Sequence, residues 1–202
     1  MDLPHMKKFK EVILYLENQA IPTIFEALRG KNMDWHFIFL KAYTVVSTFA
    51  DLGDKKCKEL YDYYTQFIEN YIIDCKIKLN DDEKSNIIEG FLFHTKNINF
   101  VIYYMQRIFS YLDRFYTIAK AKVSLSKSAM NLYKSIFYEE FKNKIQDEIN
   151  TLEKEEKNAN DELISKIQRV KVILKEVNFE NPKIIREKDE IKWENQIKGK
   201  YY

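Results

Sequence analysis

Large apolar residues recur at intervals of three and four along most of this chain, which is the spacing of one face of an α-helix. The pattern predicts three helices in the first part of the chain, over about residues 4–29, 34–49 and 55–78. The stretch from Asp81 to Ile118 has no proline and one glycine, so we expect one long helix, or two joined by a bend between Gly90 and Lys96. A fifth helix is expected to carry the apolar residues from Met130 to Ile145.

Residues that begin and end helices fall between these predicted segments. Pro22 either bends the first helix or restarts it, and Gly30 ends it. Before the later helices stand Asp, Asn and Ser residues, whose side chains accept hydrogen bonds from the free backbone N–H groups of a helix start. The expected caps are Asp34, Asp54, Asn80 and one of Ser124, Ser126 and Ser128.

The composition shifts after Phe141 toward Lys, Glu, Asp and Asn. Residues 154–160 are expected to form an exposed loop or a frayed helix end, and Asp161 to cap a further helix through Leu174. A turn over residues 178–182 and a short helix over residues 189–202 are expected to follow. This tail has too few large apolar residues for a core of its own, so it either packs on what precedes it or begins a further unit.

The predicted second helix, DWHFIFLKAYTVVSTF, is apolar on more of its circumference than an ordinary surface helix. At about 100° per residue, Phe37 and Leu40 point away from the main apolar stripe. That stripe consists of Trp35, Ile38, Phe39, Ala42, Tyr43 and Val46. One face can enter a local core while the other needs a partner, unless both faces are internal.

Composition points to an all-α fold and against partners recognised by bulk charge. The chain of 202 residues contains 4 Gly and 3 Pro, too few for the turns of a β-sandwich or barrel. Lys and Arg number 33 against 31 Asp and Glu, a net charge of +2 that does not favour a nucleic-acid binder. A chain of this length suits one large domain or two small ones.

Cysteine usage and hydropathy favour a cytoplasmic or nuclear protein. Cys57 and Cys75 lie on one predicted helix, which holds them too far apart for a disulfide, so both are expected to be reduced. The chain opens without a signal-peptide pattern, and it has no apolar run long enough to span a membrane.

The sequence offers no pattern typical of catalysis, metal binding or cofactor binding. His5, His36 and His94 are scattered, neither cysteine has CxxC spacing, and the glycines are isolated rather than grouped in a phosphate-binding loop. The adjacent Asp81 and Asp82 fit a helix start better than acid–base chemistry. The aromatic residues stand at helical spacing, which favours core positions over base stacking. We therefore expect no enzyme, no metal and no cofactor.

Five short stretches carry a resemblance to a known family. They are AYTVV at 42–46, LYDYYTQFIENYI at 60–72, IFSYLDRFY at 108–116, NLYKSIFYEEF at 131–141 and LEKEEKNANDELI at 152–164. Together they resemble the amino-terminal region of the cullins, with YLDRFY the most specific piece, over roughly residues 9–178. The resemblance implies a five-helix cullin repeat over residues 1–150 and the incomplete start of a second repeat over residues 151–202.

Cullins are scaffolds of ubiquitin ligases, which act in ubiquitin-dependent protein catabolism. In the family, the second and fifth helices of the first repeat bind an adaptor of the BTB/POZ fold, such as a Skp adaptor, elongin C or a BTB protein, and through it the substrate receptors. The resemblance therefore implies a non-catalytic scaffold with a partner-binding site. Carried over by position, that site would comprise Trp35, Ile38, Phe39, Ala42, Tyr43 and Val46 on the second helix and Ala129, Leu132, Tyr133 and Ile136 on the fifth. Leu132 and Ile136 fit the core equally well.

Two departures indicate a divergent member and leave the choice of adaptor open. The glycine common after the fifth helix of the family is replaced by Lys157 and Asn158, and the tryptophan expected near His94 is absent. Nothing resembles the carboxy-terminal domain that recruits the RING subunit or its lysine for a ubiquitin-like modifier, which favours a truncated piece of a longer scaffold. The alternative is an unrelated helical bundle that self-associates, or binds another protein, through the same stripe. A nucleic-acid or membrane-surface binder using the lysine-rich tail is the weaker third reading.

Overall fold

The computed structural model describes most of the chain and shows only helices there. The described residues are Met6, 8–31, 35–81, 86–120, 122–154 and 161–177, with the backbone alone at 35, 36, 153, 154, 161–163, 166 and 174–177. Every described element is helical, which confirms the all-α prediction. The chain divides into two compact units, Met1–Glu155 and Glu156–Tyr202.

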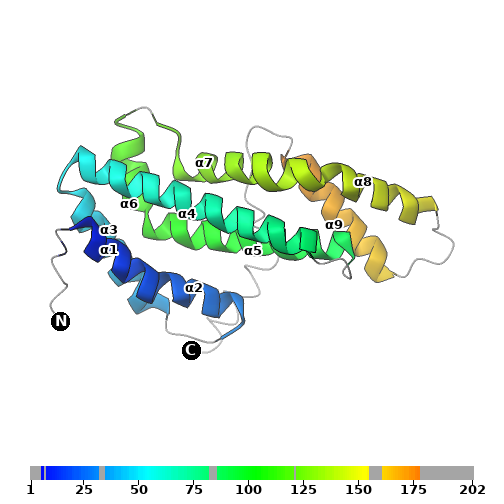
Figure 1. The fold of residues 1–202 in the computed structure, drawn as a ribbon, viewed down its shortest axis with the longest axis horizontal. Coiled ribbons are helices and arrows are strands. Elements are labelled where there is room, and N and C mark those ends of the chain that lie inside the picture. The colour runs from blue at the N-terminus through cyan, green and yellow to red at the C-terminus, as the bar shows by residue number, and fades with distance from the viewer. Residues whose placement is uncertain are drawn as a thin grey trace, which may run out of the picture. The chain divides into compact units, whose positions relative to one another are not determined.

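The described part of the first unit consists of five helical rods (Figure 1), three of which contain a π-helical segment, labelled η. The rods are α1 (Phe9–Tyr15) with η1 (Leu16–Ala20) and α2 (Ile21–Leu28); α3 (Trp35–Ala50); α4 (Asp54–Asp81); α5 (Ile87–Ile108) with α6 (Ser110–Leu112) and η2 (Asp113–Thr117); and α7 (Leu125–Leu132) with η3 (Tyr133–Tyr138) and α8 (Glu139–Lys154). The second unit contributes α9 (Asp161–Val177). The predicted helix at Asp161 is therefore present.

Helix α4 is the central rod of the first unit. It packs against α3, α5, α7 and η3, and Figure 1 shows it running beside α5 through the middle of the bundle. Its apolar residues recur every three or four positions, as the sequence predicted, and Leu60, Tyr64, Ile68 and Ile72 are fully buried. Cys57 and Cys75 lie on this helix as free, buried thiols.

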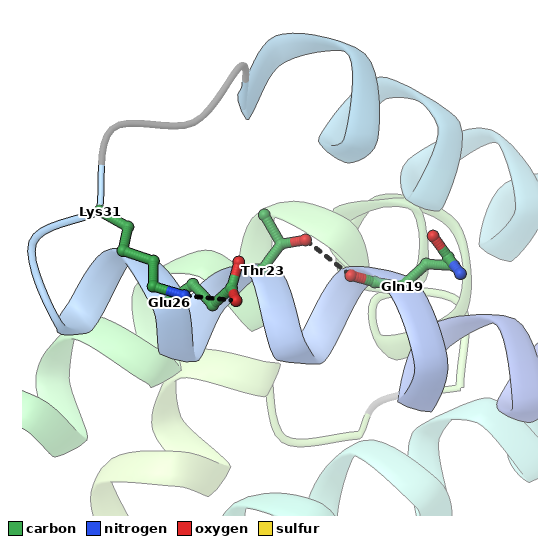
Figure 2. Close-up of polar contacts among 4 residues, drawn as sticks. All are labelled: Gln19, Thr23, Glu26 and Lys31. Carbon is green, nitrogen blue, oxygen red and sulfur yellow. Dashed lines mark hydrogen bonds and ion pairs between the residues drawn. The ribbon is translucent and has the colours of Figure 1, made fainter.

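The first rod ends at Gly30, as predicted. Gly30 has a φ of 78°, and its N–H bonds to the carbonyl of Ala27 while the Lys31 N–H bonds to that of Glu26. This pairing is the Schellman arrangement, which glycine favours because it lacks a Cβ. Figure 2 shows the Lys31 ammonium reaching back to the Glu26 carboxylate, at 3.0 Å.

Pro22 neither breaks nor ends the first rod. The helix continues through it because η1 precedes it, and the wider π turn accommodates a residue that lacks a backbone N–H. The hydroxyl of the next residue, Thr23, donates to the Gln19 carbonyl at 2.7 Å (Figure 2). Pro22 therefore sits within the first turn of α2, where proline is tolerated.

Two boundaries differ from the prediction. Asn80 does not begin a helix, because α4 continues to Asp81 with Leu79 still buried. The next described helix is capped by Asn86, whose side-chain oxygen accepts a hydrogen bond from the Ile88 N–H at 2.8 Å. Asp54 is the first residue of α4 rather than a cap before it, and Gly53 accepts the first helical hydrogen bonds.

The long fourth rod is interrupted at Phe109 and not between Gly90 and Lys96. Helix α5 runs without a break through Gly90, because Ile88 and Phe91 on either side are buried at helical spacing. Phe109 leaves the helical region with φ −94° and ψ 9°, and its buried ring packs against Tyr64. Tertiary packing thus sets this break.

The fifth rod begins as predicted. Ser124 caps it, accepting a hydrogen bond from the Lys127 N–H. Several other predictions fall outside the described residues: the cap at Asp34, the loop before Asp161, the turn at 178–182 and the helix at 189–202. In the part of the chain that the structure describes, no helix is both long enough and apolar enough to cross a bilayer.

Candidate protein-binding surface

Helix α3 has an inner face that holds the bundle together. Ala42, Val46 and Phe49 on this face are fully buried, and the helix packs against α1, η1, α4, α5 and α6. The face follows the stripe seen in the sequence at spacings of three and four. Ala42 and Val46 of that stripe therefore belong to the protein's own core.

The outer face of α3 carries large apolar side chains in solvent. Phe37 is 50% exposed and Leu40 is 66% exposed. Two polar residues near them bond to the helix itself: the Thr44 hydroxyl donates to the Leu40 carbonyl at 2.8 Å, and the Ser47 hydroxyl donates to the Thr44 carbonyl. Because these hydroxyls are already engaged, the outer face presents mainly hydrocarbon and aromatic surface.

Aromatic and basic side chains border this outer face. On the side toward α5, the half-buried Phe39 ring stacks on Tyr104 with their centroids 5.0 Å apart. On the side toward the first rod, the Lys41 ammonium lies 5.5 Å from the centre of the Tyr15 ring. Helix α3 contains no acidic residue. The surface is therefore apolar at its centre with a cation at one edge.

Four residues of the predicted site lie in the core, which corrects that part of the prediction. Ala42, Val46 and Ala129 are fully buried, and Tyr133 is 1% exposed with its hydroxyl 2.9 Å from that of Thr95. A side chain sealed by its own bundle has no surface to offer a partner in this conformation. The remaining predicted residues with described side chains are half-buried: Ile38, Phe39, Tyr43, Leu132 and Ile136. The side chain of Trp35 lies outside the described residues.

The structure does not bring the two halves of the predicted site together. The fifth rod packs on α4 and α5, and Figure 1 shows these two helices running between α3 and α7. Phe37 and Leu40, which the prediction left out, are the most accessible apolar residues among the described side chains of α3. Their position opposite the main stripe was the signal that could have identified them.

The YLDRFY segment holds helices in place. The Asp113 carboxylate accepts the Leu125 N–H at 2.8 Å, and the Tyr111 hydroxyl donates to the Asp51 carboxylate. Tyr116 is buried against the Tyr61 ring. These contacts fix the connections at one end of the bundle.

Burial governs the titratable groups of the interior. It raises the pKa of the Cys75 thiol to about 11 and raises the pKa values of the Tyr64 and Tyr133 hydroxyls, so all three are neutral near neutral pH. Among the described residues, no group of three or more His, Cys, Asp and Glu side chains is arranged to hold a metal ion.

Comparison with known proteins assigns most of the chain to one family model. The cullin alpha solenoid domain matches residues 16–188. No curated protein matches the chain.

Proposed function

Because the chain belongs to the cullin family, whose alpha solenoid domain is a structural scaffold, we propose that it is a non-catalytic scaffold module of a cullin-RING ubiquitin ligase. In this proposal the module binds a BTB/POZ-fold adaptor of the Skp, elongin C or BTB class and reaches substrate receptors through it. A RING subunit would join through the carboxy-terminal region typical of the family. The complex would act in the cytoplasm, the nucleus or both.

The observation that carries the proposal is the outer face of α3. Phe37 and Leu40 stand in solvent on a helix whose opposite face is sealed in the core. Removing a Phe or Leu side chain from water contributes about 1.5–3 kcal/mol. Two such side chains beside the half-buried Tyr43 and Phe39 form the kind of apolar and aromatic cluster that dominates binding energy at protein interfaces.

The proposed adaptor contact centres on this face and reaches the fifth rod only at its edge. Leu132 and Ile136 are half-buried, so each has some surface to contribute. Helices α4 and α5 lie between the two contacts in Figure 1. A large partner would have to span them to touch both, so α3 is expected to supply most of the affinity.

The test is a titration of the chain with purified representatives of the three adaptor classes. The double variant Phe37→Ala with Leu40→Ala should weaken binding at least about thirtyfold, the loss of about 2 kcal/mol expected for a hot spot. The matched control is Ile77→Ala with Phe93→Ala, which removes exposed apolar side chains from α4 and α5. The variant Leu132→Ala with Ile136→Ala measures the contribution of the fifth rod.

Unchanged binding by the α3 variant, with wild-type helicity, would contradict the proposal. Light scattering of the isolated chain checks the alternative use of the same face. If the wild-type chain forms a homodimer and the α3 variant is a monomer, the face serves self-association instead of adaptor binding.

A further inference from the structure

A row of aromatic side chains runs along the outer side of α5. Phe93, Phe100 and Tyr104 follow one another at spacings of seven and four residues, which places them within about 40° of one another around the helix. Phe93 is 61% exposed, and the other two are half-buried. The residues that α5 buries in the core, such as Ile98 and Ile102, lie on the opposite side. We name the aromatic row the α5 ridge.

The rings of the α5 ridge are held in place by their neighbours. The centroids of Phe100 and Tyr104 lie 4.6 Å apart, and Tyr104 stacks on Phe39 of α3 with an angle of 22° between the ring planes. Because Phe39 covers one face of the Tyr104 ring and Phe100 lies against the same ring, little of it is free to stack on a nucleic-acid base. The ridge is therefore suited to apolar side chains rather than to bases.

Two cations border the α5 ridge on one edge. Lys96 and Arg107 are exposed and lie eleven residues apart, so they point in nearly the same direction about 16 Å apart along the helix. Neither forms an ion pair among the described residues. The Arg107 guanidinium donates to the Tyr103 hydroxyl at 2.8 Å and lies 5.2 Å from the centre of that ring, which fixes its position. Both positive charges are therefore available to a partner's carboxylates.

We propose that the α5 ridge binds an amphipathic helix of a partner protein that carries two carboxylates about three turns apart, on one edge of its apolar face. Such a helix, lying along α5, would place its apolar face on the aromatic row and bring one carboxylate to Lys96 and the other to Arg107. Charge complementarity favours an acidic helix and sets its register on α5. This contact goes beyond the adaptor contact proposed for α3, because residues of α5 form it.

Phage display of a helical peptide library against the immobilised chain supplies the probe. The library fixes Leu and Phe at spacings of three and four, which gives every peptide an apolar face, and randomises the other positions. The selected peptides should carry Asp or Glu at two positions about eleven residues apart. One selected peptide, synthesised with a fluorophore, is then titrated with the chain and its variants by fluorescence anisotropy.

The double variant Lys96→Glu with Arg107→Glu should weaken binding of this peptide at least about tenfold, as should Phe93→Asp alone. A second peptide, in which lysines replace the two carboxylates, should bind the double variant more tightly than it binds the wild type. This exchange of charges identifies the two contacts directly, because damage to the fold would not be repaired by a change in the peptide.

Matched controls change other exposed positions. Lys10→Glu with Lys127→Glu makes the same change in net charge on α1 and α7, and Ile77→Asp places a carboxylate at a 52% exposed position of α4. Both should leave peptide binding unchanged. Circular dichroism checks the helicity of each variant, and none of the substituted side chains is buried.

Selected peptides without the acidic pair, equal weakening by the controls, or no gain from the exchanged charges would overturn the proposal. Loss of peptide binding in Phe37→Ala with Leu40→Ala would place the peptide on α3 and overturn it too. A homodimer that becomes monomeric in Phe93→Asp would assign the ridge to a second copy of the chain. Binding of single-stranded oligothymidylate, but of no selected peptide, would assign it to nucleic acid. Either result would replace the partner helix.

Discussion

The carboxylate of Asp113 accepts a hydrogen bond from the backbone N–H of Leu125 at 2.8 Å. This bond joins the end of the fourth rod to the start of the fifth and satisfies one of the free N–H groups at a helix start. Leu125 is also held by Tyr64, whose hydroxyl donates to the Leu125 carbonyl. The start of the fifth rod is therefore fixed by side chains from both neighbouring rods.

Replacing Asp113 with alanine is expected to lower the free energy of unfolding. The Leu125 N–H would lose a charged acceptor, a change that typically costs about 1.5–3 kcal/mol. Urea denaturation followed by circular dichroism measures the loss. Asp113→Asn keeps an acceptor oxygen and should recover part of it, whereas Asp62→Ala, which removes an exposed ion pair, should cost less than about 1 kcal/mol. Equal stability of the Asp113 and Asp62 variants would contradict this role.

The buried pair of hydroxyls on Thr95 and Tyr133 should show coupling. Tyr133→Phe removes one partner and leaves the Thr95 hydroxyl, 2% exposed, without it, at a cost of about 1–3 kcal/mol. Thr95→Val should cost a similar amount, and the double variant less than the sum of the two. A double-mutant cycle of unfolding free energies measures the difference, and strict additivity would show that the hydroxyls do not interact.

Gly30→Ala should destabilise the chain through the backbone alone. A Cβ at this position meets nothing within 4 Å, so no clash contributes. The φ of 78° remains unfavourable for alanine, at a cost of about 1–2 kcal/mol. Asparagine tolerates this conformation better, so Gly30→Asn should lie between the wild type and Gly30→Ala in thermal unfolding. An unchanged melting temperature in the alanine variant would mean that the first rod ends in another way.

The free energy of unfolding should fall as the pH rises above 9. Burial raises the pKa of the Cys75 thiol from 9.0 to about 11, so the folded state keeps a proton that the unfolded chain releases. The stabilisation from this thiol is complete below pH 9 and is lost as the pH rises toward 11. Burial also raises the pKa values of Tyr64 and Tyr133, so they add a loss in the same direction above pH 10.

Urea denaturation at a series of pH values measures this dependence. Cys75→Ala should reduce the part that begins near pH 9, since it lacks this thiol. It should leave the parts due to the tyrosines and to the Cys57 thiol, whose pKa burial also raises. A wild-type stability that rises between pH 9 and 11 would contradict the effect of burial.

Hydrophobic periodicity alone predicted the rods of the first unit. Each has a continuous buried stripe at spacings of three and four, as α4 shows from Leu60 to Leu79. The predictions that Gly30 ends the first rod and that Ser124 caps the fifth are also confirmed, because each depends on the local backbone alone. Such local signals suffice when one short segment determines the outcome.

The interruptions of the rods depended on tertiary packing and were not predictable in the same way. Gly90 does not bend α5, because buried neighbours outweigh its cost of about 1 kcal/mol in a helix. Phe109, where the rod does break, has no unusual local sequence, and its ring packs on Tyr64. The sequence gives little warning of contacts between residues so far apart.

The π segment in the fifth rod has a pattern that could have been noticed. Apart from Tyr138, the buried residues there recur at a spacing of four: Leu125, Ala129, Tyr133, Phe137, Phe141, Ile145 and Ile149. In an α-helix of about 3.6 residues per turn such a stripe drifts around the axis. The wider turns of η3 reduce that drift and keep the stripe facing the core.

The surplus apolar surface of α3 could be predicted from the sequence, because this helix has two apolar faces. The sequence showed that one face was surplus but not which one, since Val46 and Leu40 are both aliphatic and only packing separates them. Two residues of the main stripe, Ala42 and Val46, are buried in the core, and the rest of its described side chains are half-buried. The smaller group with Phe37 and Leu40 lies in solvent. The number of apolar residues was thus a poor guide to which face is free.

The most direct test of the central claim is hydroxyl-radical footprinting of the chain alone and with saturating adaptor. Oxidation of Phe37 and Leu40 should fall in the complex to near background, because a partner covers the outer face of α3. Phe93 and Ile77, exposed on α5 and α4, should react equally in both samples. The proposal that this face binds the adaptor would be contradicted if Phe37 and Leu40 were oxidised as fast in the saturated complex as in the free chain.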